Sequence, residues 1–413
     1  MKTLAILVGG GPAPGINAVI AAATIEARNH GARVLGCYDG FTWLVEGDAE
    51  HTVELKIDEL SRIHFDGGSI IRTSRTNPAR TPDGVDRVAD TLKRLGVDHL
   101  MTIGGDDTAY AASRVAKAAV GLTVAHVPKT IDNDLPLPSD IVTFGFTTAC
   151  NLGKDLVHNL MQDAATTERW FFVTVMGRRA GHLALGIGGS AGATLTVVAE
   201  EFPEAKVPLD RIADILEGAI VKRRMHGRNH GVAILSEGLA EKLDLETLGP
   251  IERDQYGNAR LAELDLGRVL KERVAGRLRE RKVDVTIVAK DLGYELRCAR
   301  PGAHDIQYAR SLGYWATRFL LEGGSNAMIT IQAGRLVPIP FGLLLDPKTG
   351  KIRVRYVDVE SEMYQTIYAY MVRLKPEDFD DRATLATLAK TGNLSEAEFV
   401  SRFGPLVGRA RQK

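Results

Sequence analysis

The sequence predicts an α/β fold of two lobes, with mostly parallel sheets that helices cover on both faces. Short apolar runs alternate with longer segments of helical periodicity through the first 340 residues, and this alternation is typical of parallel sheets. The 413 residues of the chain exceed the usual size of a single hydrophobic core. Glycines and polar residues gather directly after several apolar runs, where the sheets of such folds bind their ligands.

The first lobe is predicted to comprise residues 1–138. Its strands are short apolar runs, at 4–8, 99–103 and 123–127. Its helices carry apolar residues at helical spacing, over 17–28, over 84–95 and from about residue 108. Gly96, directly after the second of these helices, is a typical stop signal. Strands and helices therefore alternate along this lobe.

The second lobe is predicted to comprise residues 139–340 and to repeat the alternation. Its strands are expected at 171–176, 194–198, 232–235 and 283–288. Its helices are expected around 148–162, 208–225, 262–280 and 305–321. After Pro340 the chain becomes polar and mixed, which predicts a C-terminal extension, residues 341–413, packed over the core.

The composition excludes several classes of partner. The chain has 52 basic and 52 acidic residues, whereas binding to nucleic acid or to an anionic membrane needs a basic excess. It contains no run of 18 apolar residues, and the apolar segment near its N-terminus is too short for a signal peptide. Three cysteines are too few for a disulfide framework. We therefore expect a cytoplasmic protein that binds neither nucleic acid nor membrane.

A first loop rich in glycine spans Gly9–Asn17, between a predicted strand and a predicted helix. Glycines let the backbone turn sharply and bring N–H donors close to an anion, and the helix N-terminus favours negative charge. A dinucleotide fingerprint fails because Pro14 stands in place of its last glycine, and no Gly-Lys-Ser/Thr follows to make a Walker loop. Taken alone, the loop is a phosphate-binding candidate or a tight strand-to-helix turn.

A second loop, Gly104–Thr108, ends one strand and opens a helix with two consecutive aspartates. A carboxylate in this position can hold a magnesium ion that bridges phosphate oxygens. The alternative for this segment alone is a turn or a helix cap.

A third loop, Pro128–Asp134, follows the next strand and combines a lysine, a threonine and two aspartates. A carboxylate there could accept a proton while the neighbouring cation neutralises phosphate charge. The alternative is a polar turn.

Together the three loops resemble the phosphofructokinase family. The first matches the family pattern G-G-x-A-P-G-x-N, the second resembles G-G-D-G-S, and the third matches T-I-D-N-D. Further along, Met176–Gly181 resembles M-G-R-x-A-G, and Ser236–Gly238 contains the glutamate of a substrate-contacting motif. The resemblance covers residues 3 to 335 and implies the two-lobed phosphofructokinase-type fold. It also implies that the first lobe binds the phosphoryl donor and the second the sugar phosphate.

The resemblance implies a role for each matching residue on the donor side. Gly10, Gly11 and Arg75 would contact the donor phosphates, and Asp106 would coordinate Mg²⁺. Asp132 would take the proton from the 1-hydroxyl of fructose 6-phosphate, with Thr130 and Ile131 also in contact with that substrate.

On the sugar-phosphate side, the resemblance implies that fructose 6-phosphate is held by Met176, Gly177, Arg178 and Glu237. Tyr294 and Arg297 stand where relatives carry a His-x-x-Arg pair, so they inherit the contact with the 6-phosphate. Arg169 resembles an arginine that reaches the site of a neighbouring subunit, which implies a homodimer or homotetramer. The role of Lys290 stays open.

Two departures from the family's ATP-dependent pattern predict that the donor is pyrophosphate. Asp107 and Lys129 each replace a glycine, and this pair resembles the pyrophosphate-dependent branch. A carboxylate about 4 Å from the α-phosphate of ATP would cost about 4 kcal/mol at an effective dielectric constant near 20, which corresponds to nearly three decades of affinity. Lys129 would stabilise the transferred and leaving phosphates. In this interpretation, Asp132, Lys129 and Asp107 are the catalytic residues.

The expected reaction is phosphoryl transfer from pyrophosphate to fructose 6-phosphate, which gives fructose 1,6-bisphosphate and phosphate. Two alternatives remain open, an ATP-dependent 6-phosphofructokinase and a catalytically silent regulatory subunit. Sedoheptulose 7-phosphate presents similar chemistry and is an open alternative substrate.

Overall fold

A computed structural model describes residues 1–244 and 265–408. The chain divides into two compact units, each formed by two segments. Unit 1 comprises residues 1–149 and 294–355, and unit 2 comprises residues 150–293 and 356–413. Each lobe expected from the sequence was one continuous range. In the structure, the chain enters unit 2 at residue 150, returns to unit 1 at residue 294 and enters unit 2 again at residue 356. The division of binding roles between the lobes stays a prediction.

Unit 1 is built on a seven-stranded sheet with the order β11-β10-β5-β4-β1-β2-β3. The five inner strands are mutually parallel, and β3 and β11 pair antiparallel at the two edges. The strands are β1 (Thr3–Val8), β2 (Arg33–Cys37), β3 (Thr52–Glu54), β4 (His99–Gly104), β5 (Thr123–Pro128), β10 (Ala327–Gln332) and β11 (Arg335–Pro340).

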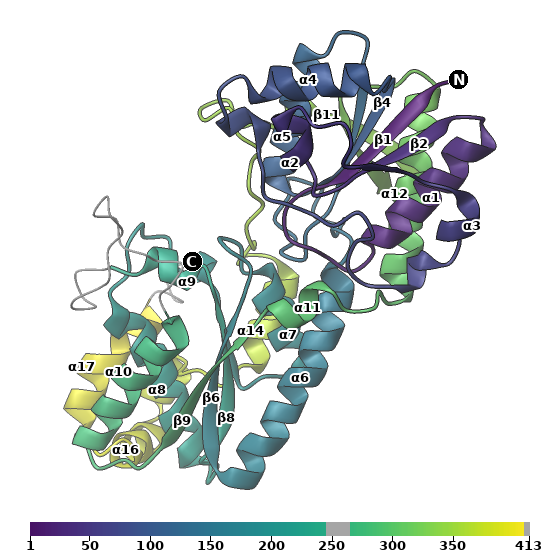
Figure 1. Ribbon diagram of the computed structural model, residues 1–413. Helices are drawn as coiled ribbons and strands as arrows, with labels where there is room; N and C mark the ends of the chain where they lie inside the picture. The colour runs from purple at the N-terminus through teal and green to yellow at the C-terminus, as the bar shows by residue number, and fades with distance from the viewer. Residues whose placement is uncertain (245–264, 409–413) are drawn as a thin grey trace. The chain divides into compact units, whose positions relative to one another are not determined.

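Helices cover both faces of this sheet (Figure 1), and β1 shows why. Its alternate residues Leu4, Ile6 and Val8 belong to one hydrophobic cluster, whereas Ala5 and Leu7 belong to another. Successive side chains of a strand point to opposite faces, so a continuous apolar run must be buried on both. The helices on the first face are α1 (Ile16–Asn29), α3 (Ile57–Leu60) and α12 (Ala303–Leu321). Those on the second are α2 (Thr42–Glu46), α4 (Gly84–Arg94), α5 (Asp106–Ala118) and α13 (Phe341–Leu344).

Unit 2 is built on a four-stranded, fully parallel sheet with the order β7-β8-β6-β9. Figure 1 shows α8 and α10 on one side of this sheet and α6 on the other. The strands are β6 (Arg169–Val175), β7 (Leu195–Val197), β8 (Gly231–Ser236) and β9 (Thr286–Leu292). The helices are α6 (Phe146–Thr167, which begins in unit 1), α7 (His182–Ala191), α8 (Leu209–Met225), α9 (Leu239–Lys242) and α10 (Leu266–Glu280).

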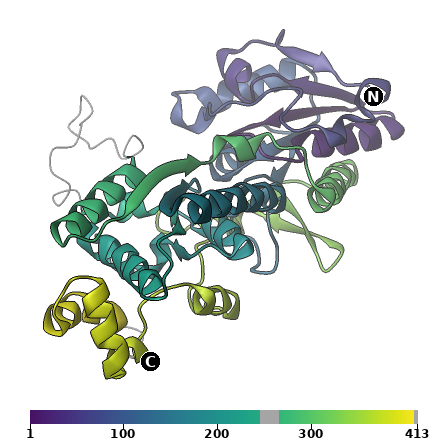
Figure 2. The same ribbon diagram turned by 90° about the horizontal axis from the view of Figure 1, so that it is seen from below.

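The C-terminal helices α16 (Arg382–Thr391) and α17 (Glu396–Gly408) pack on α8 of unit 2 (Figure 2). Val221 of α8 shares a buried cluster with Leu388, Phe399 and Phe403, and this contact removes the apolar faces of two short helices from water. The helices of this segment are α14 (Glu362–Tyr370), α15 (Glu377–Asp380), α16 (Arg382–Thr391) and α17 (Glu396–Gly408).

The α/β class with mostly parallel sheets is confirmed. The strand expected at 283–288 lies at Thr286–Leu292, and β2, β3, β10 and β11 were not predicted. β11 was missed because its sequence contains two prolines and an arginine, which a strand tolerates only at a sheet edge. The first three residues of the helix expected at 262–280 lie outside the described residues.

Candidate functional site

The glycine loop after β1 lies against the start of α5. Gly10 has a φ of +82° and donates its N–H to the Ser74 carbonyl at 2.7 Å. A Cβ placed on Gly9 would lie 2.3 Å from Oγ1 of Thr108, so no larger residue fits there. Because the carboxyl ends of parallel strands meet at one edge of a sheet, the first and second predicted loops come into contact.

Lys129 brings the third loop to the same place. It follows β5, is only 3% exposed, and donates a hydrogen bond from Nζ to the Gly11 carbonyl. A Cβ on Gly10 would lie 3.2 Å from this Nζ. A buried ammonium group is costly unless polar groups surround it, so its position beside the glycine loop indicates a site built for negative charge.

The two aspartates of the second loop occupy the first turn of α5. The N-terminus of a helix favours negative charge, and Asp106 and Asp107 are its first two residues. Asp107 is half exposed, and its Oδ1 accepts hydrogen bonds from Arg80 Nη2 at 2.9 Å and from Asn77 Nδ2 at 3.4 Å. Neither partner was predicted from the sequence, because Arg80 and Asn77 lie 27 and 30 residues before Asp107 in the chain.

The residues around Asp132 form an ordered turn. The Asp132 N–H donates to Thr130 Oγ1 at 3.0 Å, and the Thr130 carbonyl accepts from Thr143 Oγ1 at 2.6 Å. Asn133 has a φ of +55°, and its carbonyl accepts two bonds from the Arg355 guanidinium, at 3.0 and 3.1 Å. The turn therefore fixes the backbone that carries Thr130, Ile131 and Asp132.

Arg75 and Arg297 add positive charge beside the glycine loop. Arg75 is exposed and directly follows Ser74, whose carbonyl binds Gly10. A Cβ on Gly11 would lie 3.4 Å from Cζ of Arg297, and this Cζ lies 4.8 Å from the centre of the Tyr294 ring. Arg297 therefore lies next to the glycine loop within unit 1, and its expected contact with the 6-phosphate stays a prediction.

His126 is a residue that sequence reasoning missed. It is fully buried on β5, with Nδ1 2.8 Å from Thr102 Oγ1 and Nε2 2.9 Å from the Gly104 carbonyl. Burial lowers its pKa to about 3, so the ring is neutral and Nε2, which faces an acceptor, carries the proton. His126 thereby holds the backbone that leads into Asp106. The sequence did contain a signal for this role, because a histidine within an apolar strand is expected to be buried and hydrogen-bonded.

In unit 2, Glu237 organises the loop after β6. Its Oε2 accepts the N–H groups of Gly177 at 3.0 Å and of Arg178 at 2.8 Å. Gly177 has a φ of +157° and Arg178 a φ of +50°, so the loop turns sharply directly after Met176. The strands β6 and β8 are parallel neighbours, which is why two motifs some 60 residues apart meet. The predicted residues Met176, Gly177, Arg178 and Glu237 are therefore brought together.

Arg169 is not part of this group. It begins β6, whereas Met176 directly follows the last residue of that strand. At about 3.3 Å per residue, the two lie roughly 20 Å apart along the sheet. Arg169 Nε lies 3.9 Å from Asp163 Oδ1. Within one chain, Arg169 and the Met176 loop thus belong to opposite ends of the sheet.

The described residues contain no group of three or more His, Cys, Asp or Glu side chains that could hold a metal ion. This does not conflict with a magnesium site at Asp106, because Mg²⁺ is commonly bound by one or two carboxylates together with phosphate oxygens of the substrate. Asp106 is the first residue of α5, and Thr108 of the same helix lies against Gly9 of the glycine loop. A single carboxylate in this position fits the way in which Mg²⁺ is bound together with phosphate oxygens. Within the part of the chain that the structure describes, every helix is too short or too polar to span a bilayer.

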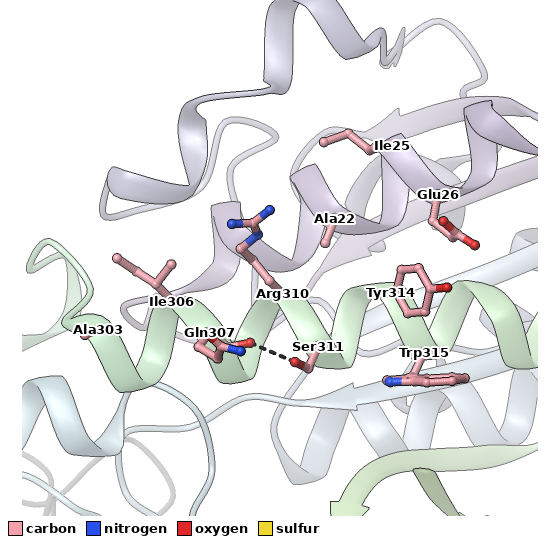
Figure 3. Close-up of a pocket in the computed structure, with 10 residues that line it drawn as sticks. All are labelled: Ala22, Ile25, Glu26, Ala303, Ile306, Gln307, Arg310, Ser311, Tyr314 and Trp315. Carbon is pink, nitrogen blue, oxygen red and sulfur yellow. Dashed lines mark hydrogen bonds between the residues drawn. The ribbon is translucent and has the colours of Figure 1, made fainter. Parts of the chain in front are cut away.

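A separate pocket of about 610 Å³ lies between α1 and α12. Figure 3 shows side chains from both helices around it, including Glu26, Arg310, Tyr314 and Trp315. None of the predicted site residues lines this pocket.

Comparisons with known proteins agree on one family. A family model described as Phosphofructokinase matches residues 3–320. The pyrophosphate–fructose 6-phosphate 1-phosphotransferase of Thermotoga maritima is 51% identical over 411 residues, which are 97% of this chain and 98% of the relative. The protein of the same name from Naegleria fowleri is 48% identical over 420 residues, covering 98% of this chain and 96% of the relative.

A solved structure shares the fold. The pyrophosphate-dependent phosphofructokinase from Marinobacter aquaeolei aligns with a TM-score of 0.67 at 17% identity, covering 96% of this chain and 92% of that one.

Proposed function

Since the chain belongs to the phosphofructokinase family, we propose that it transfers a phosphoryl group from inorganic pyrophosphate to the 1-hydroxyl of fructose 6-phosphate. The products are fructose 1,6-bisphosphate and phosphate, and the reaction is reversible. The observation that carries the proposal is the buried Lys129, whose ammonium group contacts the glycine loop. The names of the relatives at 51% and 48% identity support the same donor. This activity belongs to glycolysis or gluconeogenesis in the cytoplasm.

On the donor side, the backbone N–H groups of Gly10 and Gly11 and the side chains of Lys129 and Arg75 bind pyrophosphate. Pyrophosphate has no nucleoside through which it could be anchored, so its affinity must come from charge. A cation fixed beside the transferring phosphate also stabilises the charge of the transition state without reorganisation. The burial of Lys129 strengthens this effect because less water screens it.

Asp106 would hold Mg²⁺, and this ion would supply positive charge to the phosphate oxygens of the donor. The position of this carboxylate in the first turn of α5 supports the assignment. The neutral ring of His126 keeps the preceding Gly104 carbonyl in place, so the approach of Asp106 to the loop edge is fixed before the donor binds.

Asp132 accepts the proton of the sugar 1-hydroxyl as the phosphoryl group arrives. The turn around it is held by Thr130, Thr143 and Arg355, which supports a fixed position for the carboxylate. A general base must lie within hydrogen-bond reach of the proton it takes. Such an ordered turn meets this requirement better than a mobile loop would.

Fructose 6-phosphate is held by Met176, Gly177, Arg178 and Glu237, with further contacts from Thr130, Ile131, Tyr294 and Arg297. Arg169 serves the site of a neighbouring subunit in a homodimer or homotetramer. The roughly 20 Å between Arg169 and the Met176 loop of its own chain supports this assignment, because one chain's Arg169 and Met176 do not reach one sugar phosphate.

The proposal is tested by initial rates of the purified chain with Mg²⁺, fructose 6-phosphate and either pyrophosphate or ATP. We expect kcat/KM for pyrophosphate to exceed that for ATP by at least about 100-fold, because Asp107 disfavours ATP and Lys129 favours pyrophosphate. Faster turnover with ATP would contradict the proposed donor, and no turnover with either donor would contradict an enzymatic role. Parallel assays with sedoheptulose 7-phosphate define the sugar.

A further inference from the structure

The carboxylate of Asp107 is held by a cation. Arg80 Nη2 lies 2.9 Å from Asp107 Oδ1, and the side chains of Arg80 and Asp107 are 71% and 51% exposed. An ion pair this exposed adds little to folding stability. The pair lies beside Asp106 at the start of α5. We therefore expect it to influence the binding of an anion there more than the stability of the fold.

The turn that carries Arg80 is held by a hydrogen bond, a proline and a close contact with α4. Asn77 is buried, and its Oδ1 accepts the N–H of Ala79 at 3.0 Å while its Nδ2 points to Asp107. Pro78 fixes the first residue of the short 3₁₀ helix Pro78–Arg80. A Cβ on Gly84 would lie 2.5 Å from the Pro78 carbonyl oxygen, so the start of α4 packs closely against the turn. The backbone of this turn places Arg80 within reach of Asp107.

The pairing of Arg80 with Asp107 bears on how a carboxylate can lie in a site that binds phosphate. A carboxylate beside the donor repels any phosphate, and pyrophosphate as well as ATP would be weakened by it. Asp107 alone could therefore exclude ATP only at the expense of the intended donor. When Arg80 compensates the charge of Asp107, the Asp107 side chain acts mainly through its size. It then obstructs a donor that is larger than pyrophosphate.

We propose that Arg80 is a specificity-determining residue of the donor site: it neutralises Asp107 so that this side chain blocks nucleoside triphosphates without repelling pyrophosphate. Arg80 acts through Asp107, and Asn77 fixes the geometry of the pair. The inference rests on the proposed function, because it assumes that pyrophosphate is the donor.

The test compares steady-state kinetics with pyrophosphate in wild type, Arg80→Gln, Asp107→Asn and the double variant. Arg80→Gln should raise the KM for pyrophosphate about tenfold, the size expected when one charge beside a polyanion loses its partner. The kcat should stay within about twofold, because the charge acts on the bound donor and on the transition state alike. Adding Asp107→Asn should restore the KM to within about threefold of wild type.

Arg87→Gln is the matched control, because Arg87 lies on α4 nearby, is exposed, and contacts the Pro82 carbonyl rather than Asp107. It should leave the KM for pyrophosphate unchanged. An unchanged KM in Arg80→Gln, or a raised KM that Asp107→Asn does not restore, overturns the inference while pyrophosphate activity of the wild type still stands. A wild type that fails to use pyrophosphate overturns the proposed function and this inference together.

Discussion

Two groups of charged residues in this molecule differ in how they are paired. In unit 2, Glu217 of α8 is completely buried, and its two oxygens accept hydrogen bonds from Arg281 and from Arg402 of α17. Burial raises the pKa of Glu217, although both arginines lower it. At the loop edge of unit 1, Asp107 is half exposed, and Lys129 contacts a backbone carbonyl of the glycine loop.

The difference teaches how structural and functional charges can be distinguished. In the unit 2 cluster, acids and arginines of three helices neutralise one another, and their effect is to hold α17 on α8 and α10. At the unit 1 edge, glycines, cations and a helix N-terminus lie together, which favours the binding of an anion. Substitutions in the first group should therefore affect stability, and substitutions in the second should affect turnover or the KM for a substrate.

The largest effect is expected at Asp132. Asp132→Asn removes the group that accepts the hydroxyl proton, so kcat should fall by roughly 10²–10⁴-fold. The KM for fructose 6-phosphate should change little, because the contact matters chiefly in the transition state. Steady-state kinetics in both substrates measure this, and a variant that keeps more than about a tenth of wild-type turnover would show that another group is the base.

Arg402→Met tests the structural cluster. It leaves one oxygen of the buried Glu217 without its arginine, so the free energy of unfolding should fall by about 3 kcal/mol. Activity with pyrophosphate should persist at temperatures where the variant is folded. Urea denaturation and initial rates measure the two quantities. If Arg402→Met lost activity without losing stability, the assignment of the unit 2 cluster to a purely structural role would be wrong.

His126 predicts a pH dependence of stability. Its pKa is lowered to about 3 in the folded protein by burial, whereas the unfolded chain binds the proton near pH 6.5. A lowered pKa means that stability is fully present above pH 6.5 and is lost as the pH falls towards 3, by up to about 1.4 kcal/mol per pH unit.

His126→Gln keeps a donor for the Gly104 carbonyl but does not titrate. Between pH 6.5 and 5, the wild type should lose about 2 kcal/mol relative to this variant. Urea denaturation of both proteins across that range measures the difference, and parallel curves would contradict a neutral, buried His126.

The smallest effect is expected at Arg169. Arg169→Ala should raise the KM for fructose 6-phosphate about tenfold through loss of a charge-assisted contact, and it should spare the KM for pyrophosphate. Sedimentation of the active wild type is the companion measurement, because a fully active monomer would exclude a contribution from a neighbouring subunit.

The sequence predicted the strands that carry the loops, because their apolar runs are buried on both faces. It also predicted that the candidate site residues directly follow strands. The structure shows that Gly10, Asp106 and Lys129 follow the parallel neighbours β1, β4 and β5, which explains why their loops lie together. It did not predict β2, β3 or the hairpin of β10 and β11. β3 has only three residues, and β11 contains two prolines.

The partners of the site residues were beyond sequence reasoning. Arg80 and Asp107 are 27 positions apart, and no periodicity links a surface turn to a helix start. The cost of about 4 kcal/mol assigned to Asp107 beside ATP assumed an uncompensated carboxylate. Arg80, at 2.9 Å, offsets part of that repulsion, so the volume of Asp107 carries more of the expected selectivity.

The most direct test of the account is the ratio of kcat/KM for ATP to that for pyrophosphate in wild type, Asp107→Gly, Lys129→Gly and the double variant. Asp107→Gly should raise the ratio by opening space for a nucleotide. Lys129→Gly should raise it by depressing turnover with pyrophosphate, because a cation at the transferring phosphate is lost. The double variant should have the highest ratio, although neighbouring residues need not act additively. A ratio that stays flat through Asp107→Gly and the double variant would contradict the assignment of donor choice to these two residues.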